Sequence, residues 1–301
     1  MSASYKLTAF ASKQVVQAAL LEHDEREEWD FDLVISGREV AEDRPQEWVL
    51  EAWYPALPDD TQKSAITSLF ASTAPKLSVE ELRDEDWLTL SQQGVDPIRA
   101  GRFYVHTPEH NPDPSDGTIN LAIPASQAFG TGQHETTAGC LAVLDAMKRS
   151  GVVAKKVADI GTGTGLLAFG ARALWPRAEF TASDIDEVCA SVIADNAALN
   201  NVPIGPKRGA VTMVIAPGTD HPVIEARGPY DVLIANILAG PLVALAPDFA
   251  AATKPGGHVL LAGLLETQEA NVRKAYRAQG FRLASRLVNG DWSILWLRKR
   301  R

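Results

Sequence analysis

A glycine-rich turn between an apolar run and a helix-forming segment constrains the fold of this chain more than any other feature. The β-like run Val157–Ile160 contains Asp159 and is followed by three glycines at alternate positions, Gly161, Gly163 and Gly165. An apolar, alanine-rich segment of helical character comes next. Glycine lets a ligand approach the backbone, and the free amides at a helix start attract its polar groups. The pattern predicts an α/β fold with a parallel sheet and a ligand beyond its strand ends.

A second acid and the spacing of the glycines narrow the class of ligand. Asp184 ends the next β-like run, where a carboxylate can accept hydrogen bonds from ribose hydroxyls. Leu166 stands where the dinucleotide motif GxGxxG has its third glycine, and the chain contains no Gly-Lys-Ser or Gly-Lys-Thr phosphate loop. The spacing favours an adenosine-containing ligand that has no pyrophosphate. The alternative is a turn that needs glycine for packing alone.

Two further segments carry candidate site residues. The run from Tyr230 is typical of a buried parallel strand and ends in Asn236, whose amide can accept a hydrogen bond from an incoming amine. The alternative role for Asn236 is to cap the helix expected from Ala239. Upstream, residues 128–137 read Ala-Phe-Gly-Thr-Gly-Gln-His-Glu-Thr-Thr and lead into a helix, which makes a second ligand cradle. Taken alone, His134 in this run fits a structural or surface histidine better.

These motifs together resemble those of the bacterial ribosomal protein L11 methyltransferases, the PrmA family. Residues 128–137 are similar to that family's AFGTGxHxTT, residues 159–168 to its D-[VIF]-G-x-G-[ST]-G-[IL]-L-A, and residues 235–242 to its fourth motif. Further matches are Lys254-Pro255-Gly256-Gly257, Gly263-Leu264-Leu265, Gln268 and Trp292. The resemblance covers residues 86–298 and is fainter before them. Ala182 and Ala262 depart from the glycine and serine that are usual there.

The resemblance implies a fold, a cofactor and a substrate. The fold is a Rossmann-like class I methyltransferase sheet with a smaller N-terminal α+β, ferredoxin-like domain. The cofactor is S-adenosyl-L-methionine, and the substrates are lysine side chains and the N-terminal amine of ribosomal protein L11. Other readings are a related methyltransferase that acts on nucleic acid or a small molecule, and a non-catalytic adaptor that binds the cofactor.

Roles for individual residues follow from the motifs and the resemblance. Cofactor binding falls to Thr137, Asp159, Gly161, Gly163, Gly165, Asp184 and Asn236. Asn236 is also expected to lie between the cofactor and the amine. Phe129 is expected to line the methyl-transfer channel, where an aromatic face favours cations. His134 is expected to orient its loop or relay a proton. No metal is expected.

Composition and charge fit a cytoplasmic enzyme. Of the 301 residues 46% are hydrophobic and 22% charged, no apolar run reaches the ~18 residues of a membrane span, and Cys140 and Cys189 have no metal-type spacing. Residues 1–100 contain 20 acidic and 9 basic residues, which gives −11, whereas the rest contain 18 and 20, which gives +2. The acidic first third is expected to attract a basic protein and not to bind nucleic acid directly, although its acidity could serve solubility alone. A monomer is sufficient for this activity.

The order of elements divides the chain. Strand-like runs at 5–10, 29–36, 48–54 and 78–82 and helical runs at 13–25 and 60–72 predict the ferredoxin-like order βαββαβ. We expect a substrate-recognition domain at 1–106, a linker at 107–118 that contains three prolines, and the methyltransferase domain at 119–301. A last pair of strands at 282–287 and 293–297 matches the reversed edge strand of class I methyltransferases.

Overall fold

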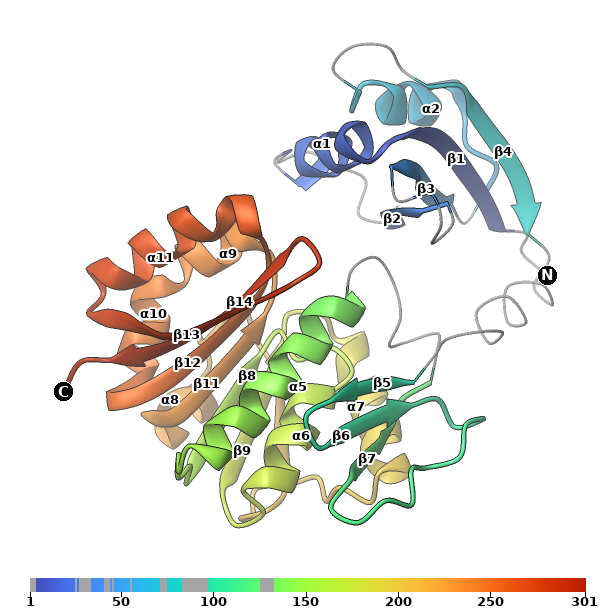
Figure 1. Ribbon diagram of the computed structural model, residues 1–301. Coiled ribbons are helices and arrows are strands. Elements are labelled where there is room, and N and C mark those ends of the chain that lie inside the picture. Colours follow the sequence, from blue (N-terminus) through green and yellow to red (C-terminus); the bar gives the residue numbers. More distant parts are fainter. Residues whose placement is uncertain are drawn as a thin grey trace. The chain divides into compact units, whose positions relative to one another are not determined.

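A computed structural model describes residues 4–24, 26, 34–40, 44, 46–54, 56–70, 75–82, 97–124 and 133–301. Contacts between Cα atoms divide the chain into two compact units, Met1–Gly94 and Val95–Arg301 (Figure 1). Among the described helices, none combines the length and the apolar composition needed to cross a membrane.

The first unit is an antiparallel sheet covered by two helices. Its elements are β1 (Ser4–Ser12), α1 (Lys13–Asp24), β2 (Val34–Glu39), β3 (Glu47–Tyr54), α2 (Asp60–Thr67) and β4 (Leu77–Leu82). The strand order is β2-β3-β1-β4 with antiparallel neighbours, which confirms the ferredoxin-like fold. Alternate residues of β1 and β3, such as Leu7 and Leu50, pack in one core with Val16 of α1 and Ile66 of α2.

Two element boundaries in this unit differ from the prediction. Helix α2 ends at Thr67 and not near Ser72, and its cap is Asp59, which accepts a hydrogen bond from Gln62 N at 2.8 Å. Gln62 Oε1 in turn accepts a hydrogen bond from the Asp59 amide, so a capping box starts the helix. Strand β2 covers the end of the predicted run 29–36, and residues 27–33 lie outside the described ones.

The second unit is built on a seven-stranded sheet of order β10-β9-β8-β11-β12-β14-β13. Strands β8 (Lys156–Ile160), β9 (Glu179–Asp184), β10 (Val211–Ile215), β11 (Tyr230–Asn236) and β12 (Thr253–Leu265) are parallel. Strand β14 (Trp292–Lys299) is antiparallel to both of its neighbours, β12 and β13 (Phe281–Asn289). This is the predicted methyltransferase sheet. The reversed strand, however, lies between two others and is not at the edge.

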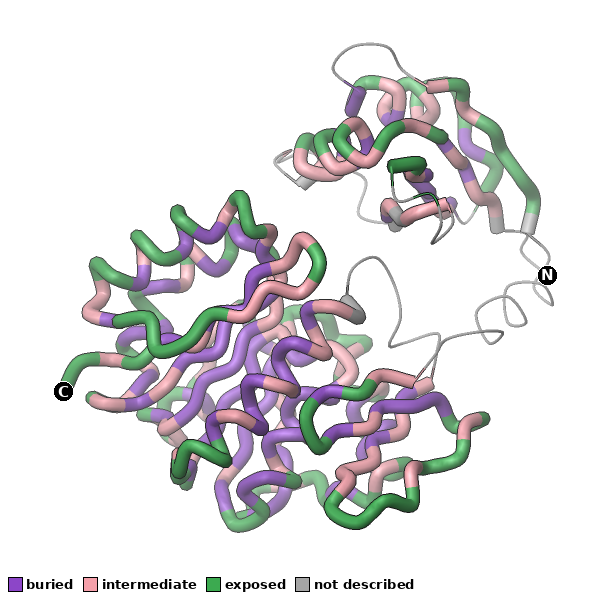
Figure 2. The backbone as a smooth tube through the Cα atoms, viewed as in Figure 1, coloured by how far each residue is buried: buried purple, intermediate pink, exposed green. Residues whose placement is uncertain are grey.

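Helices cover both faces of this sheet and create two cores (Figures 1 and 2). Helices α5 (Gln133–Arg149), α6 (Leu166–Leu174) and α7 (Val188–Leu199) contribute to one core. Helices α8 (Pro222–Arg227), α9 (Ala239–Ala244), α10 (Ala246–Ala252) and α11 (Glu269–Ala278) contribute to the other. Because side chains alternate along a strand, Val232 and Ile234 of β11 belong to the first core, and Leu233 and Ala235 to the second. Such burial on both faces is why these strands are continuously apolar.

A small sheet lies where the sequence predicts the boundary between the two domains. Strand β6 (Phe103–His106) pairs with β5 (Ile98–Ala100) and, across the proline-rich residues 107–118, in parallel with β7 (Ile119–Ala122). Phe103 and Leu121 are buried in the same core as α5 and α6. The contacts therefore divide the chain at Gly94, before the expected linker. The functional boundaries 1–106, 107–118 and 119–301 stay a prediction.

Gly139 tests how tightly α5 packs on the sheet. A Cβ at this position would lie 2.5 Å from Cδ1 and 2.6 Å from Cγ1 of Ile294, a fully buried residue of β14. We expect Gly139→Ala to lower the free energy of unfolding by about 1–3 kcal/mol, because a packed core has no room for an added methyl group. Urea denaturation measures this change in the free energy of unfolding. Gly240→Ala in α9 is the control, since nothing lies within 4 Å of its Cβ. Equal stability of the two variants would contradict this packing.

Candidate functional site

The predicted cofactor residues lie where the carboxyl ends of β8, β9 and β11 meet. Gly161 follows β8, Asp184 ends β9 and Asn236 ends β11. The strands are in register, since Ile160 pairs with Ser183 and Ile234 with Asp159. The parallel sheet therefore brings three distant segments of the chain to one edge, as in open α/β folds generally.

The glycine turn has one residue that faces open space. Gly161, Gly163 and Gly165 have φ of 71°, 52° and 82°, a region that favours glycine. A Cβ at Gly161 would collide with the Ile237 side chain, and one at Gly165 would lie 2.7 Å from the Phe169 ring. Beyond its chain neighbours, no described residue lies within 4 Å of a Cβ placed at Gly163. Packing alone therefore explains Gly161 and Gly165. Gly163 leaves its side of the turn open for a ligand.

Asp159 is buried under the turn that it precedes. Its Oδ2 accepts hydrogen bonds from Thr162 Oγ1 at 2.7 Å and from Ala168 N at 3.0 Å, so one carboxylate oxygen holds the turn to the start of α6. The side chain is 2% exposed. Burial raises the pKa of Asp159 to about 7, although these two hydrogen bonds act in the opposite direction. Burial therefore favours the protonated form of Asp159 in the folded chain.

Asp184 lies against the same turn. Its Oδ2 accepts a hydrogen bond from Gly163 N at 2.8 Å, and its Oδ1 accepts one from Asp186 N at 3.2 Å. The acid predicted to bind ribose is thus fixed beside the open glycine. Nearby, burial together with the charges of Asp184 and Asp186 raises the pKa of the Cys189 thiol to about 12, so Cys189 stays protonated at neutral pH.

Asn236 is held by a residue that sequence reasoning missed. Its Nδ2 donates to Oγ1 of Thr136, at 3.4 Å, and Thr136 is buried near the start of α5. The amide oxygen of Asn236 takes no part in this bond. The alternative role of Asn236 as a helix cap is wrong, because α9 begins after Leu238 and has no side-chain cap. The bond links the 128–137 motif to the end of β11.

A close backbone approach positions Asn236 from the other side. Gly263 in β12 has a φ of 84°, and a Cβ there would lie 2.7 Å from the carbonyl carbon and 2.9 Å from the nitrogen of Ile237. Gly161 meets the Ile237 side chain. Ile237 is thus enclosed between two glycines from two different strand ends. This explains the match at Gly263 that the sequence showed without a role.

Asn196 of α7 and Asn200, which directly follows this helix, support the loops around the site. Asn196, which is 1% exposed, donates to the carbonyl oxygen of Thr164 in the glycine turn at 3.1 Å. Asn200 accepts from Ala122 N and donates to Ala122 O, both at 2.7 Å, at the end of β7. Neither residue was predicted. The signal was asparagine repeated four residues apart in an alanine-rich helix, where asparagine is unfavourable without a specific bond.

A network of hydrogen bonds around the buried Glu269 lies on the β12–β14 side of the site. Glu269, which is 5% exposed, accepts hydrogen bonds from Ser293 Oγ at 2.8 Å, from Arg273 Nη1 at 2.9 Å and from Arg286 Nε. Burial alone raises the pKa of Glu269, but the bonds from Arg286, Ser293 and Arg273 outweigh it and hold the pKa below its ordinary value. Glu269 is therefore ionised and fixes the start of α11 to β13 and β14.

The remaining predicted residues belong to the segment before and at the start of α5. Thr137 is half-buried in α5, next to Thr136. His134 lies in the same helix, but its side chain and the whole of Phe129 are outside the described residues. Asn289 at the end of β13 donates to the carbonyl oxygen of Glu135 at 3.0 Å and so anchors this helix start. Among the residues with a described position, no cluster of three His, Cys, Asp or Glu side chains could hold a metal.

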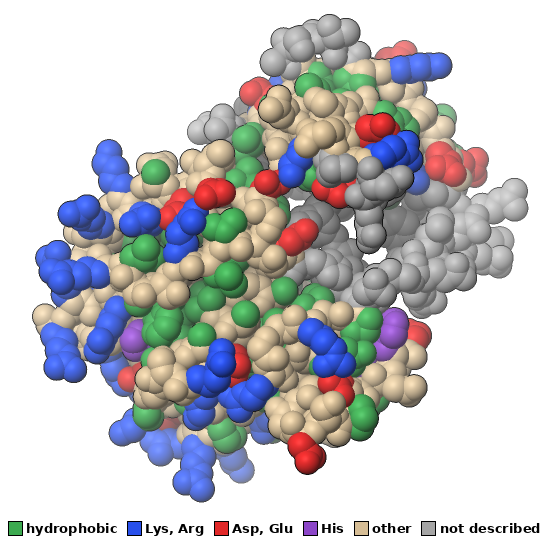
Figure 3. Space-filling model, viewed as in Figure 1, with side chains coloured by type: hydrophobic (Ala, Val, Ile, Leu, Met, Phe, Trp, Pro, Cys, Tyr) green, Lys and Arg blue, Asp and Glu red, His purple; other side chains and the backbone are tan. Residues whose placement is uncertain are grey.

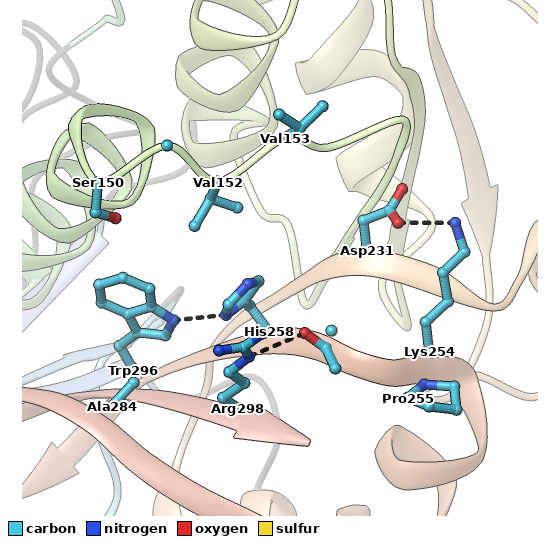
Figure 4. Close-up of a pocket in the computed structure, with 13 residues that line it drawn as sticks. Ser150, Val152, Val153, Asp231, Lys254, Pro255, His258, Ala284, Trp296 and Arg298 are labelled. Carbon is cyan, nitrogen blue, oxygen red and sulfur yellow. Dashed lines mark hydrogen bonds and ion pairs between the residues drawn. The ribbon is translucent and has the colours of Figure 1, made fainter. Parts of the chain in front are cut away.

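Two hollows lie at the opposite edge of the sheet, away from these residues. One, of about 470 Å³, is bordered by the end of α5, the starts of β11 and β12 and the end of β14 (Figure 4). The other, of about 610 Å³, lies between α11 and β13. The predicted site residues line neither hollow, but Arg273, which donates to Glu269, lines the second.

The chain matches one protein family over nearly its whole length. Residues 5–300 match the model of the family described as ribosomal protein L11 methyltransferase (PrmA). The chain belongs to this family. Its members use S-adenosylmethionine, and the family's fold and motifs agree with the sheet and the turn described above.

Individual proteins agree with this assignment. The ribosomal protein L11 methyltransferase of Caulobacter sp. (strain K31) is 38% identical over 80% of each chain. That of Rhizobium meliloti (strain 1021) is 36% identical over 94% of this chain and 92% of its own length. A crystal structure of ribosomal protein L11 methylase from Lactobacillus delbrueckii subsp. bulgaricus superposes with a TM-score of 0.57 at 23% identity, and covers 69% of this chain and all of its own. The last likeness supports the fold.

The raised pKa of Asp159 predicts a pH dependence of stability. A buried acid with a raised pKa favours folding in its protonated form, so the stabilisation present at about pH 4 is lost as the pH rises to about 7. Relative to Asp159→Asn, which keeps an acceptor oxygen, the free energy of unfolding of the unmodified chain is expected to fall by up to about 4 kcal/mol over this range.

Urea denaturation at several pH values measures this difference. Asp248→Asn, at an exposed acid of α10, is the control and is expected to change in parallel with the unmodified chain. Parallel profiles for all three proteins would contradict a protonated, buried Asp159.

Proposed function

We propose that this chain transfers methyl groups from S-adenosylmethionine to amino groups of ribosomal protein L11, namely lysine side chains and the N-terminal amine. The observation that carries the proposal is the position of Asn236. It ends β11 beside the glycine turn, and its amide nitrogen is already bonded to Thr136. The amide oxygen is left to accept a hydrogen bond, which is what an attacking amine offers.

The proposed cofactor site is the edge formed by the glycine turn and Asp184. The open side of Gly163 admits the backbone approach of a ligand, and the Asp184 carboxylate beside it accepts bonds from ribose hydroxyls. Asp159 braces the turn, and its carboxylate form is favoured when a cationic ligand lies close by. Thr137 completes the site from α5. These contacts suit S-adenosylmethionine because this cofactor carries positive charge.

The chain's own residues prepare the amine for reaction. When bound, S-adenosylmethionine supplies a methyl group on a sulfonium, which is a ready leaving group. The nucleophile must be a neutral amine, although lysine has an ordinary pKa of about 10.4. Exclusion of water from the site favours the neutral amine, and the Asn236 oxygen orients its N–H so that the lone pair faces the methyl carbon. Phe129 lines the channel, and His134 orients its loop or relays the released proton.

The first unit is proposed to recognise the substrate protein. Residues 1–100 carry a net charge of −11, which attracts a basic partner such as a ribosomal protein. On β4 the exposed Glu80 and Glu81 present part of this charge. A first unit, Met1–Gly94, that moves relative to the second lets one site reach several amines of one substrate. The reaction takes place in the cytoplasm, and a monomer suffices for it.

Intact-mass spectrometry tests the reaction and the role of Asn236. Ribosomal protein L11 incubated with the chain and S-adenosylmethionine is expected to gain mass in steps of one methylene. Asn236→Ala is expected to lose most turnover, roughly 100-fold or more, while its cofactor affinity stays within a few fold, because the amide acts on the amine. Asp184→Ala is expected to weaken cofactor binding directly.

Two outcomes would contradict this proposal in different ways. No mass gain with L11 despite measured cofactor binding would exclude this substrate, and nucleic acids and small amines would be tested next. Equal losses of affinity and turnover in Asn236→Ala would exclude the orienting role. Cofactor binding without methyl transfer to any of these would indicate an adaptor.

Variants of two neighbouring threonines of α5 test the orientation of Asn236 and the binding of the cofactor separately. Thr136→Val removes the hydroxyl that holds Asn236, so we expect kcat to fall about tenfold with the Kd of the cofactor within twofold. Thr137→Val is the matched control and is expected to raise the Kd instead. Calorimetry gives Kd, and timed mass spectrometry gives kcat. A Thr136→Val variant that loses affinity as strongly as turnover would contradict the proposed division.

A further inference from the structure

Lysine and arginine gather at the edge of the sheet opposite the site. Basic residues precede three parallel strands: Lys155 before β8, Arg177 before β9, and Lys207 and Arg208 before β10. Because β14 is antiparallel, its last residues and the following Arg300 and Arg301 reach the same edge. Figure 3 shows this basic edge where it passes over α11 and the C-terminal end of the chain.

The hollow between α11 and β13 is the most basic part of this edge. Five of its ten lining residues are cationic and none is acidic; the five are Arg273, Lys274, Arg277, Arg282 and Arg300. The rest of the lining is mostly apolar, with Phe281 and Leu297 buried and Leu283 37% exposed. Tyr276 also lines it, and its buried hydroxyl has no hydrogen-bond partner in the structure. The hollow thus combines a cationic lining that contains no acid with an apolar floor.

Only some of the cationic side chains at this edge bond to groups of the chain itself. Arg273 pairs with Glu269, and Lys299 donates to the carbonyl oxygens of Ala250 and Thr253 at the end of α10, where a cation caps a helix. Among the described residues, no carboxylate lies within 4.0 Å of the cationic groups of Lys274, Arg277, Arg282 or Arg300. Arg282 and Arg300, moreover, are not on a helix. Their charge is available to a partner.

The hollow on the other face of the same strands also offers donors (Figure 4). Its acid, Asp231, is neutralised by Lys254 at 2.7 Å and also accepts from the amides of Lys155 and Lys156. Trp296 Nε1 donates to His258 Nδ1 at 3.0 Å, and burial and Arg298 lower the pKa of His258, so its ring is neutral with the proton on Nε2. The described lining of this hollow therefore carries no uncompensated negative charge.

We propose that this basic edge binds the phosphate backbone of RNA while the opposite edge carries out methyl transfer. With neighbouring strands about 4.8 Å apart, the edge from β10 to β13 extends about 30 Å, which suits a polyanion better than a small anion. RNA is the polyanion chosen because a ribosomal protein is the substrate of the proposed function, on which this inference rests. The expectation of no nucleic-acid binding came from net acidity, and that acidity belongs to residues 1–100.

Fluorescence anisotropy with a labelled single-stranded RNA of about 30 nucleotides tests the proposal. The full chain is compared with Lys274→Glu/Arg277→Glu/Arg282→Glu and with a control of equal charge change in the first unit, Arg44→Glu/Lys63→Glu/Lys76→Glu. We expect the first variant to bind RNA at least tenfold more weakly at 0.1 M salt, with a shallower dependence on salt, and the control to bind within twofold. Methylation of free L11 is expected to be unchanged in the Lys274→Glu/Arg277→Glu/Arg282→Glu variant.

Each other result overturns the inference. No binding by the unmodified chain at micromolar concentration, or equal losses in both variants, would exclude a specific basic edge. Displacement by poly-L-glutamate as effective as by unlabelled RNA would assign the surface to an acidic protein. The methylation assay on the same preparations separates the two proposals, because RNA binding without methylation refutes only the proposed function, and methylation without RNA binding refutes only this inference.

Discussion

The close approach of three strand ends around Ile237 is the constraint on which the site depends. Gly161 and Gly263 come from β8 and β12, and each contacts Ile237 where any Cβ would collide. Asn236, one residue earlier, is consequently held at a fixed distance from the glycine turn. A side chain at either glycine would move the loop that carries Asn236. These two glycines therefore act on geometry, and Gly163 alone among the three in the turn faces open space.

Hydrogen bonds from side-chain amides and hydroxyls then fix the loops at the strand ends, which the hydrogen bonds between strands do not hold. Thr136 bonds Asn236, Asn196 bonds the glycine turn, and Asn200 pairs with both backbone groups of Ala122. These bonds join residues up to a hundred positions apart in the chain. Buried polar bonds of this kind cost free energy if either partner is removed, so they specify one arrangement of the loops. A pre-arranged site gains rate because the reactants meet in the required orientation.

Much of the fold and site was predictable from local sequence, and the remainder depends on contacts between distant residues. The turn at Gly161–Gly165, Asp184 and Asn236 follow from strand ends and residue type, and the structure brings them to one edge. Thr136 could not be told from Thr137, because only the position of β11 reveals which hydroxyl meets Asn236. The small sheet at 98–122 was missed because proline-rich residues separate its paired strands.

The charge distribution of the second unit follows from the same topology. Parallel strands place all their carboxyl ends together, and the acids Asp159 and Asp184 lie at that edge beside the glycine turn. The amino ends lie together at the other edge, where strand starts and helix ends accumulate arginine and lysine. A reversed β14 adds its basic end to that edge and not to the acidic one. One sheet can therefore attract a cationic cofactor and a basic protein at one edge and repel an anion from it, while the other edge remains free for polyanions.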